Sequence, residues 1–360
     1  MIHLRTLNKR QLEEFVSSGE YKKYDFLPIT RHRAVSHGKN PKADHHQTLL
    51  ILAFEDDQLA GYLGCLPDEF LTEGGETIAY AWLSTLFVSN RFRGKRIAQN
   101  LLNKAFDEYQ GNIAITEFTK EAESLYNKTG VFRYIQPKQG ERYYFRTDLA
   151  QVIPAKKPYS KPLQPVFRLA DLVINAGISL KNFFKGKPDF RFEILDTIDE
   201  ESRLFMKHFK SNRSTGDINR MIDNPWVLEG RTPEEAYLFS SYSRQFRYYW
   251  IKIFNENNEL EICSLLLLRD RHLKIPYVFS ASSTDRFVDF LSYFIIKNKV
   301  ITLTSYQAAV NSRMSTVKGF PAIHQRKIER RYMFHQNLIS NLPEYFDPGF
   351  QDGDGDCMMT

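Results

Sequence analysis

The pattern of apolar positions divides the first half of the chain into alternating strands and helices. Thr48–Phe54 and Leu59–Leu66 are nearly continuous apolar runs on either side of an acidic turn, which predicts a hairpin. Ile78–Val88 is a longer run whose last residues alternate between apolar and polar, as in a half-buried strand. From Ile97 onwards the apolar residues recur every three or four positions, the spacing of an amphipathic helix. An α/β fold is therefore expected.

The second half of the chain repeats this order of elements. It predicts a strand at Phe192–Leu195, a helix at Glu200–Phe209, a hairpin of Tyr248–Phe254 and Ile262–Leu268, a strand at Tyr277–Ser280, a helix at Arg286–Lys297 and a strand at Val300–Ser305. The repeated order of hairpin, strand, helix and strand indicates an internal duplication, with two similar folds in tandem.

Length and composition fit two globular cores. The chain has 360 residues, of which 42% are hydrophobic and 14% aromatic. It has no run of 18 uncharged apolar residues, so no transmembrane helix is expected. Cys65, Cys263 and Cys357 show neither metal-ligand nor disulfide spacing and no signal peptide is evident, which predicts a cytoplasmic location. The net charge of +6 suits an anionic ligand or a weak attraction to phospholipid, and does not predict nucleic-acid binding.

Composition also suggests where the chain divides. Residues 150–165 contain four prolines and three lysines, which predicts an extended, semi-rigid linker. The tail contains Asp-Gly-Asp-Gly-Asp, the start of a calcium loop, but lacks the acidic ligand that such a loop needs at its end. No metal is expected there. The predicted division is a first domain at 1–149, a linker and helix at 150–189, a second α/β domain at 190–345 and an acidic, solvated tail at 346–360.

Val166–Phe184 has the pattern of an amphipathic helix with a broad apolar stripe and lysines near both ends. One interpretation is a helix that lies in a membrane interface. The other is a helix that packs across the two domains. Asp171 and Asn175 interrupt the basic face that lipid binding favours, so the packed helix is preferred. Peripheral membrane contact stays open as the alternative.

A basic turn between a predicted strand and a predicted helix is the strongest candidate for a functional site. Arg91, Arg93, Lys95 and Arg96 surround Gly94. The first N–H groups of a helix and the positive end of its dipole attract anions, and glycine lets the backbone approach a ligand closely. Neither the P-loop nor the Rossmann pattern is present. The turn therefore predicts a phosphate-binding loop, with an ordinary exposed basic turn as the alternative.

This turn resembles the pyrophosphate loop of the GCN5-related N-acetyltransferase (GNAT) superfamily. The common form is Arg-Gly-x-Gly-x-Gly/Ala after a strand that ends in Leu-x-Val; Arg93, Gly94 and Ala98 fit it, whereas Arg96 replaces the central glycine. Ala122–Val131 resembles the second signature of the superfamily, Ala-x-x-Leu/Phe-Tyr-x-x-x-Gly-Phe/Val, with Thr119 where asparagine is common. The two signatures stand in the right order, and the resemblance covers residues 1–148.

The resemblance implies a GNAT-type fold, in which helices flank a mixed, mostly antiparallel sheet, and acetyl-CoA as the cofactor. It further implies that backbone amides of the central strand contact the acetyl and pantetheine groups and that Tyr126 protonates the departing sulfur. The cofactor-binding residues expected from it are Leu86, Phe87, Val88, Arg93, Gly94, Lys95, Arg96, Ile97, Ala98 and Asn127.

The general base is not evident from the sequence. Many members of the superfamily place a glutamate on the central strand, where this chain has Ser84 and Thr85. Glu117, at the end of the next strand, is the candidate for this catalytic role; a water chain or a histidine from Ile29–Asp44 is the alternative. That segment is polar and predicts a mobile loop beside an acceptor pocket. Its histidines lack the spacing of a metal site, so no metal is expected.

The second half lacks both signatures. Ser280–Asp285 replaces the basic glycine turn, and no Leu-Tyr-x-x-x-Gly follows. A second GNAT-like fold would thus be degenerate, without cofactor, and would serve acceptor recognition or packing.

The function expected from the resemblance is transfer of an acetyl group from acetyl-CoA to a primary amine. The expected acceptor is a small molecule, such as an amino sugar for a surface polysaccharide or another small amine, with a protein amine as the less favoured alternative. Because Arg96 and the missing strand carboxylate depart from the pattern, the alternative is a non-catalytic acyl-CoA-binding or interaction protein. The oligomeric state does not follow from the sequence.

Overall fold

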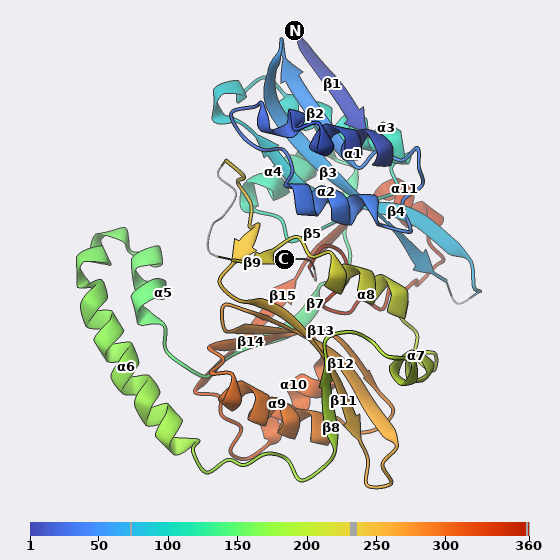
Figure 1. The fold of residues 1–360 in the computed structure, drawn as a ribbon. Coiled ribbons are helices and arrows are strands. Elements are labelled where there is room, and N and C mark those ends of the chain that lie inside the picture. Colours follow the sequence, from blue (N-terminus) through green and yellow to red (C-terminus); the bar gives the residue numbers. More distant parts are fainter. Residues whose placement is uncertain (73, 231–235, 358, 360) are drawn as a thin grey trace. The chain divides into compact units, whose positions relative to one another are not determined.

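The computed structural model describes residues 1–72, 74–230, 236–357 and 359 (Figure 1). The described chain forms two compact units, each built from segments that lie far apart in the sequence. The first unit comprises Met1–Lys138, Lys210–Arg244 and Arg330–Thr360, and the second comprises Gln139–Phe209 and Gln245–Glu329. The contiguous division predicted from composition therefore differs from the division into compact units.

The first unit contains a seven-stranded sheet of order β1-β2-β3-β4-β5-β16-β6. Neighbouring strands are antiparallel except β4 and β5, which are parallel. The strands are β1 (Ile2–Leu7), β2 (Leu50–Glu55), β3 (Gln58–Leu71), β4 (Thr77–Val88), β5 (Ile113–Thr116), β16 (Tyr332–His335) and β6 (Phe132–Tyr134). The hairpin β2–β3 and the long strand β4 confirm the predicted elements.

Helices cover both faces of this sheet, so strand β2 is apolar throughout. Ile51 and Ala53 pack in the core that contains α3, whereas the alternate residues Leu50 and Leu52 pack in the core that contains α1. The helices of this unit are α1 (Lys9–Ser17), η1 (Glu20–Lys22), α2 (Arg31–Gly38), η2 (Asn90–Phe92), α3 (Ile97–Tyr109), α4 (Lys120–Thr129), α8 (Thr215–Asp223) and α11 (Gln336–Asn341). A two-stranded parallel sheet of β9 (Leu228–Glu229) and β10 (Tyr242–Ser243) is added to them.

The second unit contains a seven-stranded sheet of order β15-β7-β14-β13-β12-β11-β8. Strands β13 and β14 are parallel, and α9 connects them and packs on the sheet. The strands are β15 (His324–Arg330), β7 (Lys138–Tyr144), β14 (Thr302–Ser305), β13 (His272–Ser280), β12 (Leu260–Arg269), β11 (Phe246–Phe254) and β8 (Phe192–Leu195). The helices are α5 (Leu149–Lys156), η3 (Pro158–Leu163), α6 (Gln164–Lys181), α7 (Glu200–Met206), α9 (Asp285–Lys297) and α10 (Ala308–Thr316).

The two sheets have the same topology, and each takes its sixth strand from the other half of the chain. In both sheets five strands follow in the order of the chain, and the fourth and fifth are parallel with a helix between them. The sixth position is filled by β16, from the end of the chain, in the first sheet and by β7, from the first half, in the second. The predicted tandem fold with mixed, mostly antiparallel sheets is confirmed, with an exchange of one strand that periodicity does not reveal.

Four segments differ from the sequence-based expectation. The predicted mobile loop at Ile29–Asp44 contains α2, which Thr30 caps by accepting a hydrogen bond from the Arg33 backbone N–H. The segment appears polar in sequence because the helix buries polar side chains, among them Arg33 and His37. The predicted extended linker is mostly helical, with Pro154 inside α5 and further prolines in η3. Proline's fixed φ is close to the helical value, so proline content alone does not predict an extended chain.

The third and fourth differences concern α6 and the C-terminal tail. Helix α6 buries none of its residues, so the preferred interpretation of a packed helix is wrong. The tail, in contrast, is not a solvated terminus, because Asp352, Asp354 and Cys357 are buried. None of the described helices combines the length and the apolar character needed to span a bilayer.

Candidate active site

The predicted phosphate loop joins β4 to α3 through two residues with a left-handed backbone. Gly94 has φ 83° and Arg96 has φ 58°. This conformation costs little for glycine and more for other residues, which explains why glycine is usual at the position of Arg96. Arg96 is the N-cap of α3, and no side chain caps the helix. The backbone N–H groups of the first turn, at Ile97 and Ala98, are therefore available to an anion.

Two of the four basic side chains of this loop form ion pairs, and the other two are exposed arginines. Arg91 pairs with Asp25, with 3.1 Å between Nη1 and Oδ2, and Lys95 pairs with Glu55, with 2.5 Å between Nζ and Oε2. Arg93 and Arg96 are both exposed. The pairs thus fix part of the loop, while the arginines add positive charge at its surface.

Strand β4 separates from β5 beside this loop. Their pairing joins Ala81 to Ile113 and Trp82 to Ala114, and within the described residues it does not continue towards the end of β4. Thr85 has φ 56°, an outlier for a β-branched residue, and it coincides with a register shift between β3 and β4. A β-bulge therefore redirects the end of β4 and leaves its edge towards β5 without strand partners.

Glycine in β3 permits this bulge. A Cβ at Gly64 would lie 2.8 Å from the Ser84 carbonyl oxygen, and a Cβ at Gly61 would lie 2.6 Å from that of Phe87. Both distances are shorter than real Cβ contacts, so any larger residue would displace β4. The small residues of β3 thus position the strand that carries the site.

The three predicted residues at the end of β4 point to opposite faces of the sheet. Leu86 and Val88 are half-buried and pack against the core that contains α3. Phe87 packs on the other face, where its ring centroid lies 5.0 Å from that of Phe26. Their side chains are thus occupied in packing, and a cofactor beside β4 would meet their backbone groups.

Tyr126 lies on the buried side of α4, in an aromatic cluster with Phe118 and Phe132. Burial raises the pKa of its hydroxyl well above the ordinary value, and the negative charge of Asp356 raises it further. Tyr126 therefore keeps its proton at neutral pH. Asn127 points elsewhere: its amide donates a hydrogen bond of 3.2 Å to the hydroxyl of Tyr134.

The position on β4 that lacks a carboxylate receives one from the tail. Ser84 donates a hydrogen bond of 2.8 Å to Oδ2 of Asp356, and Arg33 donates one of 2.7 Å to the Ser84 hydroxyl. The Arg33 guanidinium lies over the ring of Trp226, 3.7 Å from its centroid, and also donates to the hydroxyl of Tyr237 at 3.1 Å. Helix α2, strand β4 and the tail thus meet in one network.

Asp356 is the carboxylate of this network with the most suitable electrostatics for accepting a proton. Burial raises its pKa above the ordinary value, and the nearby charge of Glu117 raises it further. The hydrogen bond from Ser84 and the charge of Arg33 oppose this rise. The balance is an elevated pKa, which is the direction that acid–base catalysis requires of a carboxylate.

Ion pairs hold the tail in place. Arg330 binds the Asp352 carboxylate with Nη1, at 2.6 Å, and the Glu117 carboxylate with Nη2, at 2.9 Å. Gly355 passes so close to β5 that an added Cβ would lie 3.2 Å from the Thr116 methyl group. The tail is therefore an integral part of the first unit, packed over the ends of β4 and β5.

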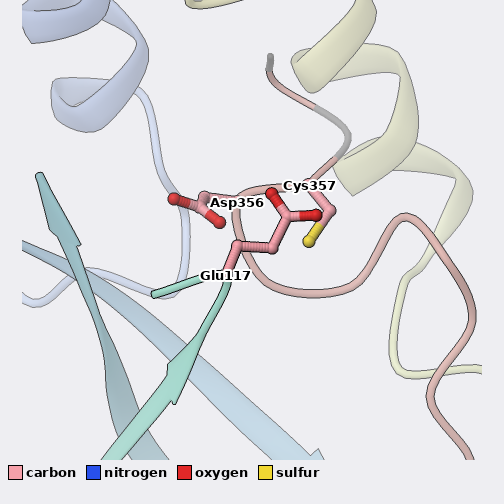
Figure 2. Close-up of side chains that lie close together, drawn as sticks. All are labelled: Glu117, Asp356 and Cys357. Atoms are coloured by element: carbon pink, nitrogen blue, oxygen red, sulfur yellow. The ribbon is translucent and has the colours of Figure 1, made fainter. Parts of the chain in front are cut away.

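Glu117, Asp356 and Cys357 form a cluster at the end of β5 (Figure 2). One ligand atom of each lies within 4.8 Å of the others, close enough to hold a metal ion. Two features oppose this use. Glu117 is already paired with Arg330, and burial raises the pKa of the Cys357 thiol well above its ordinary value, so the thiolate that binds metals is disfavoured. The cluster fits proton transfer better than metal binding.

The equivalent turn of the second unit is acidic. Glu261 accepts a hydrogen bond from Ser282 and pairs with Arg286 at 2.8 Å, and Asp285 begins α9. A carboxylate at a helix N-terminus repels an anionic ligand from that place. That the second unit does not hold the cofactor stays a prediction.

The sequence singled out the loop and Tyr126 as candidates, but it did not single out Asp356 and Arg33. Both lie far in sequence from the central strand and reach it only through tertiary structure. The one available signal was the row of three aspartates among glycines in the tail, which the sequence interpretation assigned to solvent.

Comparison with known proteins agrees with this geometry. Residues 7–131 match the family model of the acetyltransferase (GNAT) family. A conserved protein of unknown function from Enterococcus faecalis V583, described as a probable N-acyltransferase, is similar over 96% of this chain and 75% of its own, with 10% identity and a TM-score of 0.54. A tandem GNAT protein from the clavulanic acid biosynthesis pathway, solved without acetyl-CoA, is similar over 93% of this chain and 99% of its own, with 10% identity and a TM-score of 0.52.

At these identities the two solved structures support the fold and nothing finer. None of the curated proteins is significantly similar to the chain in sequence. The family match, the loop and the topology of both sheets agree, and residues 7–131 are a domain of the acetyltransferase (GNAT) family, within a chain that has the tandem GNAT fold.

Proposed function

We propose that the protein is an acetyl-CoA-dependent N-acetyltransferase that acts on a primary amine and takes its general base, Asp356, from the C-terminal tail. The observation that carries this proposal is the 2.8 Å hydrogen bond between Ser84 and Asp356. It brings a carboxylate of raised pKa to the strand position that the sequence leaves without one.

The residues present fit coenzyme A. The uncapped start of α3 offers N–H groups to a pyrophosphate, with Arg93 and Arg96 exposed beside it. The unpaired edge of β4 offers backbone groups from Leu86 to Val88 to a pantetheine chain. An open hollow on α4 is lined by Lys120, Glu123, Ser124, Asn127 and Lys128. When bound, acetyl-CoA would supply an activated thioester; the protein supplies placement and electrostatics.

Two residues take the proton-transfer roles. Asp356 accepts the proton of the acceptor amine, because its hydrogen-bond partner Ser84 is neutral and its pKa is raised. Tyr126 is the proposed proton donor to the departing sulfur, the role that the family resemblance implies, and burial raises its pKa so that it is protonated at neutral pH. Glu117, the base expected from the sequence, is bound to Arg330 at 2.9 Å and so is a weaker proton acceptor. We assign it the role of raising the pKa of Asp356.

The acceptor is proposed to be a small primary amine, such as an amino sugar. A cationic ammonium would be attracted by the carboxylates of Glu117 and Asp356, and the second of these would then take its proton. A non-catalytic acyl-CoA-binding protein is the competing function, and it predicts cofactor binding without turnover.

The proposal is tested by calorimetry with acetyl-CoA, followed by a CoA-release assay over a panel of small amines. We expect binding, and turnover of at least one amine. Asp356→Asn should lower kcat by about a hundredfold or more, in line with the usual contribution of a general base, and leave acetyl-CoA affinity unchanged. The matched control is Glu344→Gln, an exposed carboxylate between α11 and the tail, which should behave as wild type. Turnover by Asp356→Asn at the wild-type rate would remove Asp356 from the mechanism.

A further inference from the structure

Helix α6 turns its polar face towards its own protein. The Asp171 carboxylate accepts a hydrogen bond of 3.0 Å from the Ala150 backbone N–H, and the Gln164 amide donates one of 3.1 Å to the Ala150 carbonyl. The Asn175 side chain makes two bonds of 3.0 Å with the Thr147 backbone. Asp171 and Asn175, which seemed to weaken a lipid-binding face, therefore lie on the inner side of the helix.

The outer face of α6 and the residues after it is apolar. In an ordinary surface helix the apolar stripe faces the core, and here this order is reversed. Half of the exposed large hydrophobic side chains of the described chain lie within residues 149–188, which we call the α5–α6 segment. Their exposed fractions are 61% for Val166, 63% for Leu169, 66% for Leu172, 61% for Val173, 72% for Leu180, 75% for Phe183 and 90% for Phe184. Figure 1 shows α6 alongside α5 and apart from the sheet of its own unit.

The α5–α6 segment also carries the net charge of the protein. It contains seven basic residues and one acidic residue, a formal charge of +6 that equals the net charge of the whole chain. The acidic residue is Asp171, on the inner face. Arg168 and Lys181 lie at the two edges of the outer apolar face by helical periodicity, and both are exposed. Further exposed lysines lie at Lys156, Lys157 and Lys161.

We propose that the α5–α6 segment binds the surface of a membrane that contains anionic phospholipids. An apolar face bordered by cations is what an interfacial helix requires: the apolar side chains enter the boundary of the acyl chains, and the cations meet the headgroup phosphates. Phe183 and Phe184 extend the apolar face beyond the end of α6. The acetyltransferase domain would then work at a membrane surface.

Charge favours a membrane over a second copy of the chain as the occupant of this face. Two copies that met through α6 would bring two segments of charge +6 together, and repulsion between them would oppose association. An anionic bilayer supplies the opposite charge along the whole segment.

The test is co-sedimentation of the full chain with vesicles. We expect the protein to bind vesicles of phosphatidylcholine with about one third phosphatidylglycerol, and to bind vesicles of phosphatidylcholine alone weakly. Leu172→Glu should weaken binding by about tenfold or more, because it places a carboxylate in the apolar face. The matched control is Leu204→Glu, at a leucine of α7 that is 49% exposed, which should bind as wild type.

Two results would overturn the proposal. One is equal sedimentation of wild type and Leu172→Glu. The other is a stable dimer in light scattering that Leu172→Glu converts to a monomer, because the apolar face would then be covered by a second copy. Circular dichroism of each variant establishes that the exposed substitutions leave the fold intact. The result is independent of the proposed acyl transfer, which we expect Leu172→Glu to leave unchanged.

Discussion

Single residues in unusual surroundings mark the candidate site of this protein. Arg96, at the start of α3, and Thr85, in β4, have a left-handed backbone. Asp356, beside β4 and β5, has a raised pKa. Strained backbones and shifted pKa values commonly gather where a protein binds or reacts. The candidate phosphate loop and Tyr126 could be proposed from the sequence because each belongs to a local motif. Asp356 could not, because its partner Ser84 is 272 positions away.

The backbone of Arg96 predicts a stabilising substitution. Arg96→Gly should raise the free energy of unfolding by about 1 kcal/mol, because glycine adopts φ 58° without the steric cost that other residues incur. Urea denaturation measures the change. Arg93→Gly is the control, because it removes the same charge at a φ of −61° and should gain nothing. Equal effects of the two substitutions would contradict this explanation of the loop.

The buried ion pair of Asp68 predicts how stability depends on pH. Burial by itself raises the pKa of Asp68, but the charges of Arg213 and Lys42 outweigh it and lower the pKa from 3.8 to about 2. Both Arg213 nitrogens lie 2.5 Å from the carboxylate oxygens. Because the folded pKa is the lower one, this stabilisation is complete above pH 4 and is lost as the pH falls towards 2. It amounts to roughly 2 kcal/mol.

Urea denaturation across this pH range tests the assignment. In the wild type the free energy of unfolding should decrease between about pH 4 and pH 2. Asp68→Asn should remove this contribution and cost about 3–5 kcal/mol at neutral pH, because Arg213 and Lys42 stay buried without their counter-charge. Asp57→Asn, at an exposed aspartate in the turn between β2 and β3, is the control. A variant at Asp68 that is as stable as wild type would contradict the role of the ion pair.

At the scale of elements, hydrophobic periodicity predicted those that bury one regular face and failed for those that bury polar groups. Helices α3 and α9 and the hairpin of β11 and β12 were all predicted. Helix α2 was not, because it buries Arg33 and His37. Helix α6 was recognised as amphipathic, but periodicity does not tell which face is turned outwards. The tail was misjudged because its aspartates are buried against Arg213 and Arg330.

The tail carries the proposed base, so the account predicts that turnover depends on it. Replacing residues 351–357 by a flexible sequence of equal length should abolish turnover, because it removes the proposed base. Steady-state CoA release is the measurement. A gain in activity would show that the tail blocks the site, and would contradict its assigned role. Arg330→Lys is a milder companion variant. It keeps the positive charge but cannot bind Glu117 and Asp352 at once through two separate nitrogens. We expect kcat to fall and acetyl-CoA affinity to stay the same.

At the scale of the whole molecule, the chain consists of two GNAT folds that have exchanged their sixth strands. Strand β16 completes the first sheet between β5 and β6, and all four of its residues are buried. The duplication was predicted because the spacing of apolar residues identifies each helix or strand by itself, and the order of these elements repeats. The exchange was not, because a strand's own pattern does not tell which sheet it joins, and no strand was predicted at β16.

The exchange predicts that neither half folds alone. Residues 1–149 lack β16 and the tail, which leaves the edge of β5 unpaired and the core beneath it open. Expressed by itself this fragment should aggregate or lack cooperative unfolding, whereas co-expression with residues 150–360 should recover a folded complex. Size-exclusion chromatography and thermal unfolding compare the two. A stable, cooperatively folded fragment 1–149 would contradict the exchanged topology.

The most direct test of the central claim is a crystal structure of the full chain with acetyl-CoA. We predict that the pyrophosphate binds the backbone amides at the start of α3, beside Gly94 and Ile97, and that the thioester lies between β4 and β5 with Asp356 next to it. Acetyl-CoA bound at any other place, or a thioester remote from Asp356, would contradict the account.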